Sequence, residues 1–113
     1  MSLFSLTSST LFNNSKLFFS RKEFGKILSC YSLGVSNGNW KDYSINFNNN
    51  EASFFIYKNS KTLPDCIITK YMKRKKNKIL FELKLGEINK KDSDKIEDLI
   101  AILKRKNLKL ISV

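Results

Sequence analysis

Few residues in this sequence have the type and spacing that catalysis or metal binding requires. The chain contains no His, which excludes Ser-His-Asp triads, Cys-His pairs and His-ligated metal ions. Its two thiols, Cys30 and Cys66, lie far apart in the sequence and cannot form a zinc site by themselves. We therefore expect no metal and no cofactor. Reduced, buried thiols are the default for such a pair, and a disulfide between them depends on geometry alone.

The carboxylates do not form a recognisable catalytic set. Asp94 and Asp98 fit better as exposed partners of a helix dipole than as general acids or bases. No nucleophile has a candidate base, and the four Gly stand isolated rather than in a phosphate-binding loop. The remaining candidate carboxylates are Glu82, Glu87, Asp92 and Glu97. We predict that no residue is catalytic and that the protein is not an enzyme.

Basic residues are concentrated around one expected turn. The formal net charge is +11, which favours acidic partners such as nucleic acid. Eighteen of the 21 basic residues are Lys. Lys attracts phosphate but does not favour sequence-specific contacts to bases. An AT-rich coding sequence would produce the same enrichment in Lys. We predict weak binding of RNA or another polyanion at this turn, and a merely solvated turn is the alternative. The predicted nucleic-acid-binding residues are Lys70, Lys73, Arg74, Lys75, Lys76 and Lys78.

Alternating aromatic residues indicate a second candidate surface. Phe55, Tyr57 and Tyr71 are expected on the sheet face that carries no helix, opposite to Phe54 and Ile56. Such a face can stack single-stranded bases, but neither the order of elements nor any Gly-bearing aromatic strand matches a sheet-based RNA binder. We expect instead that the N-terminal arm, a protein partner or a second copy of the chain covers this face. A protein-interaction or homodimerisation module is thus the alternative function.

Trp40 begins the most distinctive tetrapeptide, Trp40-Lys41-Asp42-Tyr43. One interpretation makes Trp40 a stacking platform, with Lys41 holding a phosphate. A lone Trp between a helix end and a strand more commonly locks that corner into the core, and this is the interpretation we favour.

Two helices are expected to frame the domain. Ser20 and Glu23 have the S-x-x-E form of a capping box, which predicts a helix start, and Asn37-Gly38 supplies the end signal. The second helix begins at a cap among residues 92–94. It carries an apolar stripe, with acidic residues early and basic residues late, which suits the helix dipole.

Between the helices, alternation of apolar and polar residues predicts four strands, over residues 42–48, 52–58, 66–72 and 78–85. Short turns between them favour an antiparallel meander. The expected fold class is therefore α+β with the order αββββα, and both helices pack on one face of the four-stranded sheet. Residues 108–113 are expected to form either a short C-terminal fifth strand or a tail that docks on the core.

The length of 113 residues suits one domain, which we assign to residues 20–113. Residues 1–19 are expected to form a flexible or loosely docked N-terminal arm, because they are rich in Ser, Thr and Asn and lack the Arg content of a targeting leader. No apolar run approaches the ~20 residues that span a bilayer, so no transmembrane segment is expected.

Several segments of the chain follow one another in a distinctive order: EFGKILSCY at residues 23–31, GNWKDYSI at residues 38–45, ASFFIY at residues 52–57, and then Pro64. This order resembles an alphaproteobacterial family catalogued as domain of unknown function 2794. In that family a helix with an E-[LF]-x-x-I-L-x-x-Y core leads to a G-x-W-[RK]-D-Y-x-I segment, an A-x-F-x-[VI]-[FY] strand and a Pro.

The resemblance implies a bacterial protein of the cytoplasm and supplies no activity. The sequence departs from the family pattern at Met72, where the family has a second Pro. It departs again at residues 87–91, where the family has a basic Gly-His segment and this chain has no His. No role of that His therefore transfers to this chain.

Overall fold

The structure, a computed structural model, describes residues 16–59 and 63–111. Helix α2 (Arg21–Ser36) precedes a single sheet in sequence, and helix α3 (Ile96–Ile111) follows it. The short 3-10 turn η2 (Arg74–Lys76) joins the third strand to the fourth. The strands are β1 (Asp42–Phe47), β2 (Glu51–Tyr57), β3 (Cys66–Lys73), β4 (Lys78–Leu85) and β5 (Asn89–Ser93).

Helix α2 begins at the predicted capping box. The Ser20 hydroxyl accepts a hydrogen bond of 3.1 Å from the Glu23 N–H, and the Glu23 carboxylate accepts one of 2.7 Å from the Ser20 N–H. These two bonds satisfy backbone donors that the first helical turn leaves open. The helix ends at Asn37, and Gly38 follows with a φ of 79°, which Gly adopts without strain. The predicted helix is confirmed at both ends.

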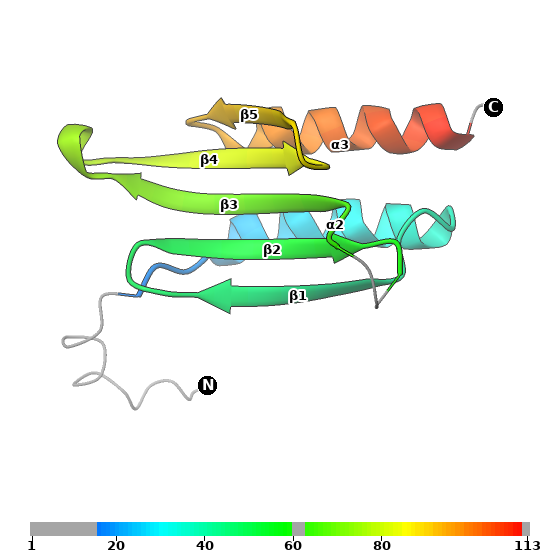
Figure 1. The fold of residues 1–113 in the computed structure, drawn as a ribbon, viewed down its shortest axis with the longest axis horizontal. Helices are drawn as coiled ribbons and strands as arrows, with labels where there is room; N and C mark the ends of the chain where they lie inside the picture. Colours follow the sequence, from blue (N-terminus) through cyan, green and yellow to red (C-terminus); the bar gives the residue numbers. More distant parts are fainter. Residues whose placement is uncertain (1–15, 60–62, 112–113) are drawn as a thin grey trace.

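All the strands pair antiparallel in sequential order, so the sheet is a meander (Figure 1). The register places Phe54 opposite both Ile45 and Ile68, and Ile68 opposite Leu83. Because directly opposed residues share a face, these apolar side chains form one continuous row across four strands. Asn77, with a φ of 49°, closes the turn between β3 and β4 in the left-handed conformation that Asn tolerates.

The sheet has a fifth strand, but it is not the C-terminal segment that the sequence suggested. Strand β5 lies between β4 and α3, and residues 108–111 continue helix α3 instead. The sequence of β5, NKKDS, is wholly polar, so alternation gave no sign of it. Its pairing depends on backbone hydrogen bonds to β4 at the edge of the sheet. Residues 112–113 lie outside the described residues.

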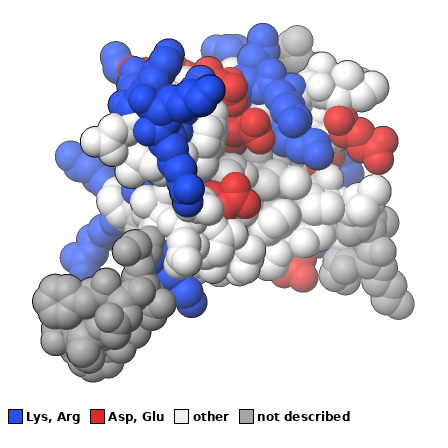
Figure 2. Space-filling model, turned by 60° about the vertical axis from the view of Figure 1, so that its left-hand side comes forward, with Lys and Arg blue, Asp and Glu red and all other residues white. Residues whose placement is uncertain are grey.

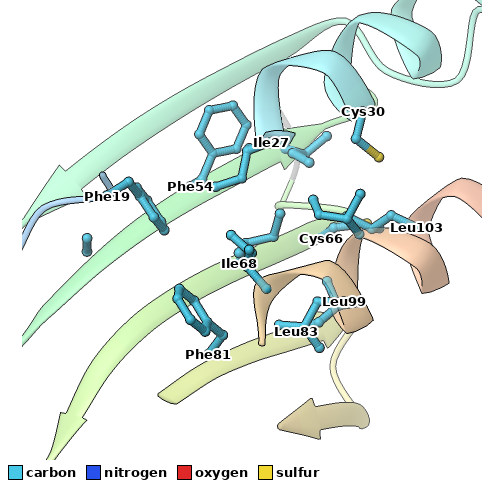
Figure 3. Close-up of a cluster of buried hydrophobic side chains, with 14 of the residues drawn as sticks. Phe19, Ile27, Cys30, Phe54, Cys66, Ile68, Phe81, Leu83, Leu99 and Leu103 are labelled. Carbon is cyan, nitrogen blue, oxygen red and sulfur yellow. The ribbon is translucent and has the colours of Figure 1, made fainter. Parts of the chain in front are cut away.

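Helices α2 and α3 lie side by side on one face of the sheet, whereas no described element covers the other face (Figure 1). Figure 3 shows Phe54, Ile68 and Leu83, from three neighbouring strands, turned toward Ile27 of α2 and Leu99 of α3. All of these side chains are buried. The α+β class, the antiparallel meander and the placement of both helices on one face are confirmed.

The part of the predicted N-terminal arm nearest to α2 packs against the domain. The Leu17 N–H donates a hydrogen bond of 3.0 Å to the Asn48 carbonyl, and the Phe18 ring lies 4.7 Å from the Phe47 ring. Phe19 is buried in the core. Residues 1–15 of that arm lie outside the described residues. Neither described helix is long and apolar enough to cross a bilayer.

Candidate functional site

The β3–β4 hairpin carries the densest group of basic residues. Lys73 ends β3, and Arg74, Lys75 and Lys76 form the 3-10 turn at its tip, where all four residues are exposed. The hairpin reaches past the other turns at one end of the sheet (Figure 1). Figure 2, in which this end comes forward, shows Lys and Arg side chains gathered along its upper part. The tip is therefore accessible to a polyanion.

Lys70, which the sequence placed in the same group, belongs to the interior of the fold. Its ammonium Nζ lies 2.8 Å from the Glu23 carboxylate and donates a hydrogen bond of 2.9 Å to the Phe18 carbonyl. The Lys70 side chain is only 12% exposed. Its position follows from alternation along β3, since Lys70 shares a face with Cys66 and Ile68, which pack against the helices.

Two other predicted basic residues contact neighbouring side chains. Lys78 lies 3.6 Å from the Asp94 carboxylate, and the guanidinium of Arg74 donates a hydrogen bond of 3.1 Å to the Asn50 side-chain oxygen. Lys73, Lys75 and Lys76 form no ion pair with any described residue. The structure therefore brings five of the six predicted residues to one end of the sheet and leaves three of them unpaired there.

The second predicted surface is the open face of the sheet. Phe55, Tyr57 and Tyr71 all lie on it, each partly exposed, with Ile67 opposite Phe55 and Leu80 opposite Tyr71. The charges on this face balance, although the whole chain is strongly basic. The acidic residues that share it are Asp42, Glu51, Glu82 and Asp92, and the basic residues are Lys73, Lys78, Lys84 and Lys90.

Four hydroxyl groups on this open face are paired with one another. The hydroxyls of Ser53 and Thr69 lie 3.2 Å apart, and those of Ser44 and Tyr57 lie 3.1 Å apart. Burial, together with nearby Asp92 and Glu82, raises the pKa of Tyr71, so its hydroxyl stays protonated. The open face therefore combines partly exposed aromatic side chains with paired hydroxyls, and the carboxylate of Glu82 lies opposite Thr69 near its centre.

A partly buried polar cluster at the other end of the sheet gave no signal in the sequence. The Trp40 indole N–H donates a hydrogen bond of 3.0 Å to Asp65, and Lys106 donates one of 3.2 Å to the same oxygen. Trp40 is only 2% exposed, which confirms that it locks this corner into the core. The three residues come from a helix–strand corner, a loop and α3, and no local spacing links them.

The two thiols are buried and unbonded to each other. Burial raises the pKa of Cys30 to about 11 and that of Cys66 to about 12, so both stay protonated near neutral pH. The expected reduced, buried state of both cysteines is confirmed. Among the described residues, no three Cys, Asp or Glu side chains gather closely enough to hold a metal ion.

Comparison with curated proteins and with solved structures finds no match. A family model described as "Protein of unknown function (DUF2794)" matches residues 17–99. The matched part runs from the chain that enters α2, through all the strands, to the start of α3. Since this is well over half of the chain, the protein belongs to the family of proteins of unknown function DUF2794.

Proposed function

We propose that the protein is a non-enzymatic accessory domain that binds RNA or another polyanion weakly through the β3–β4 hairpin. The observation that carries this proposal is the hairpin tip, where Lys73, Lys75 and Lys76 are exposed and without an ionic partner among the described residues. Arg74 lies between them, and its hydrogen bond to Asn50 leaves its charge in place. Lys-rich tips attract phosphate through charge alone, which gives weak and unspecific binding.

The proposed location is the cytoplasm of a bacterium. Two features support it: the resemblance to an alphaproteobacterial family, and two free thiols, which are typical of a reducing compartment. The same thiols support the absence of catalysis, because a buried thiol with a raised pKa is a poor nucleophile.

Titration of a labelled single-stranded RNA oligomer at several salt concentrations tests the polyanion proposal. The logarithm of the affinity should fall with the logarithm of salt by roughly 0.7 for each phosphate contact. The double variant Lys75→Glu/Lys76→Glu should weaken binding by about tenfold or more, which corresponds to about 1.4 kcal/mol.

The matched control is Lys90→Glu/Lys91→Glu, which changes the net charge equally on exposed residues of β5. If both double variants weaken RNA binding to the same extent, only the overall charge matters and the hairpin is not the site. The absence of any salt dependence would also contradict the proposal.

A protein-interaction module that uses the open sheet face is the second candidate. Its balanced charge and its aromatic side chains, Phe55, Tyr57 and Tyr71, suit a protein partner or a second copy of the chain better than a polyanion. Pull-down from native lysate, with and without nuclease, separates the candidates. Partners that survive nuclease and hairpin charge reversal, and are lost with Tyr71→Glu, would support this module.

A further inference from the structure

A groove lies between α2 and α3 on the outer surface of the helix layer. Its volume is about 610 Å³, and all of its lining residues belong to the two helices. No strand contributes to it, so the groove faces away from the sheet. It is separate from both the basic hairpin and the open sheet face. Its size lies within the range of ligand-binding clefts in proteins.

The floor of the groove is formed by small and apolar residues. Gly25 and Ser29 lie one turn apart on α2, and Ile100 and Ala101 face them from α3. A Cβ added at Gly25 would meet nothing within 4 Å, and Gly25 has no positive φ. Gly is a weaker helix former than Ala, and neither packing nor backbone conformation requires it here. The absence of a side chain at Gly25 leaves open space in the groove above this turn of α2.

The walls of the groove are basic. Arg21 and Lys22 on α2, and Lys104 on α3, are exposed and make no ion pair with a described residue. Lys26 and Glu97 pair with each other between the two helices, and their charges cancel. The hydrogen bond from Lys26 lowers the pKa of Glu97, which keeps this pair ionised. Three unpaired positive charges therefore border an apolar floor.

We propose that this groove binds an acidic amphipathic helix of a partner protein. The apolar side of such a helix fills the floor over Gly25 and Ala101, while its acidic residues meet Arg21, Lys22 and Lys104. The lining runs over residues 21–29 of α2 and 97–104 of α3, about 12 Å along each helix, which is enough to hold about two turns of a partner helix.

A helix suits this groove better than an extended peptide or RNA. The backbone groups inside α2 and α3 already bond within each helix, so an extended peptide would find no backbone partners. A partner helix satisfies its own backbone and can place a ridge of side chains into the groove. An RNA strand could meet the basic walls, but it has no apolar ridge to fill the floor.

Fluorescence anisotropy with the full chain and a panel of labelled synthetic helices tests this proposal. The probes are about 20 residues long, with Leu and Ala on one side and Glu on the other, because shorter peptides are scarcely helical. Blocking the floor with Gly25→Trp, or separately with Ser29→Trp, should weaken binding by about tenfold or more. Lys22→Glu/Lys104→Glu should do the same. Circular dichroism and thermal unfolding establish which variants remain folded.

Two controls separate the groove from the hairpin. Gly25→Ala should stay within about threefold of the original affinity, and Lys75→Glu/Lys76→Glu should leave peptide binding unchanged. The proposal is overturned if no probe binds, if folded Trp variants bind as tightly as the original chain, or if peptides of scrambled order bind equally well. Displacement of the peptide by a single-stranded RNA oligomer, dependent on Lys22 and Lys104, would show that the groove takes nucleic acid instead.

Discussion

The indole N–H of Trp40 donates a hydrogen bond of 3.0 Å to the carboxylate of Asp65, and that carboxylate also accepts one of 3.2 Å from Lys106 of α3. The corner after α2, the residue before β3 and the last helix therefore meet at a single oxygen. Trp40 is almost completely buried, so water cannot replace Asp65 as its acceptor.

Asp65→Ala should lower the free energy of unfolding by about 1–3 kcal/mol, because it leaves a buried indole N–H without an acceptor and a half-buried ammonium without its carboxylate partner. Urea-induced unfolding at neutral pH measures this loss. Asp94→Ala is the control, since it removes an exposed ion pair with Lys78, and its expected effect is about 0–1 kcal/mol. Equal losses in the two variants would show that the Asp65 cluster adds nothing beyond an ordinary surface pair.

The stabilisation from Asp65 should depend on pH. Burial alone raises the pKa of Asp65, but the hydrogen bond from Trp40 and the charge and hydrogen bond of Lys106 outweigh it, so the pKa falls below 3.8. A folded pKa below the unfolded value means that the stabilisation is complete above about pH 4 and is lost as pH falls through the folded pKa. The difference in unfolding free energy between the original chain and Asp65→Ala should therefore shrink at pH 3. A difference that grows there would contradict this assignment.

Two glycines of α2 should respond in opposite directions to the same substitution. A Cβ added at Gly34 would overlap the Trp40 ring, so Gly34→Ala should lower the unfolding free energy by about 1–3 kcal/mol. Gly25→Ala meets open space and should raise it by about 0.5–1 kcal/mol, because Ala is the better helix former. Thermal unfolding of both variants checks the pair. Stabilisation by Gly34→Ala would mean that Trp40 does not pack against this turn.

Lys70 and Lys73 should differ in stability and in RNA binding, although they lie three positions apart. Lys70→Ala leaves the partly buried Glu23 carboxylate without its positive partner and the Phe18 carbonyl without the Lys70 donor, and it should lower the unfolding free energy by about 1–3 kcal/mol. Lys73→Ala should have almost no effect on stability but should weaken RNA binding. Chemical unfolding and RNA titration on the same samples measure both properties. The reverse result would place Lys70 in the binding surface.

The thiols should be unreactive in the folded protein. With pKa values of about 11 and 12, Cys30 and Cys66 carry little thiolate at pH 8. Iodoacetamide should modify them at least about 100-fold more slowly than it modifies the urea-unfolded chain. Mass spectrometry of timed samples measures the two rates. Rapid modification of Cys66 in the folded protein would indicate that the corner around Trp40 opens.

The helices and strands that could be predicted from the sequence are those with one apolar and one polar face. Strands β1 to β4 alternate, and α2 carries both a cap and an apolar stripe, so their positions could be inferred. Strand β5 has no apolar residue and depends on an adjacent strand edge, which a sequence does not display. The end of α3 was missed because Asn107, which is fully buried, interrupts the stripe with a polar residue. Its side chain donates to the Leu103 carbonyl and so remains compatible with the helix.

The candidate sites were predictable only in part. A run of basic residues at a turn is visible in any sequence, and the structure places Lys73 to Lys76 at a hairpin tip as expected. Lys70 was grouped with them because it is near them in sequence. Its even spacing from Cys66 and Ile68 along β3 already indicated that it lies on the same face, the helix side of the sheet. The α2–α3 groove escaped prediction because it requires knowing that two helices distant in sequence lie side by side.

The pairing of α2 with α3 has a consequence for folding during synthesis. The strands are joined by short connections and can pair as they leave the ribosome, whereas α3 is the last element to be made. Until it emerges, Leu83 and its apolar neighbours on the helix side of the sheet lack their cover from Leu99 and Leu103. A nascent chain that pauses before Ile96 therefore exposes apolar side chains on the helix side of its sheet. In that state, binding by chaperones and aggregation compete with the docking of α3.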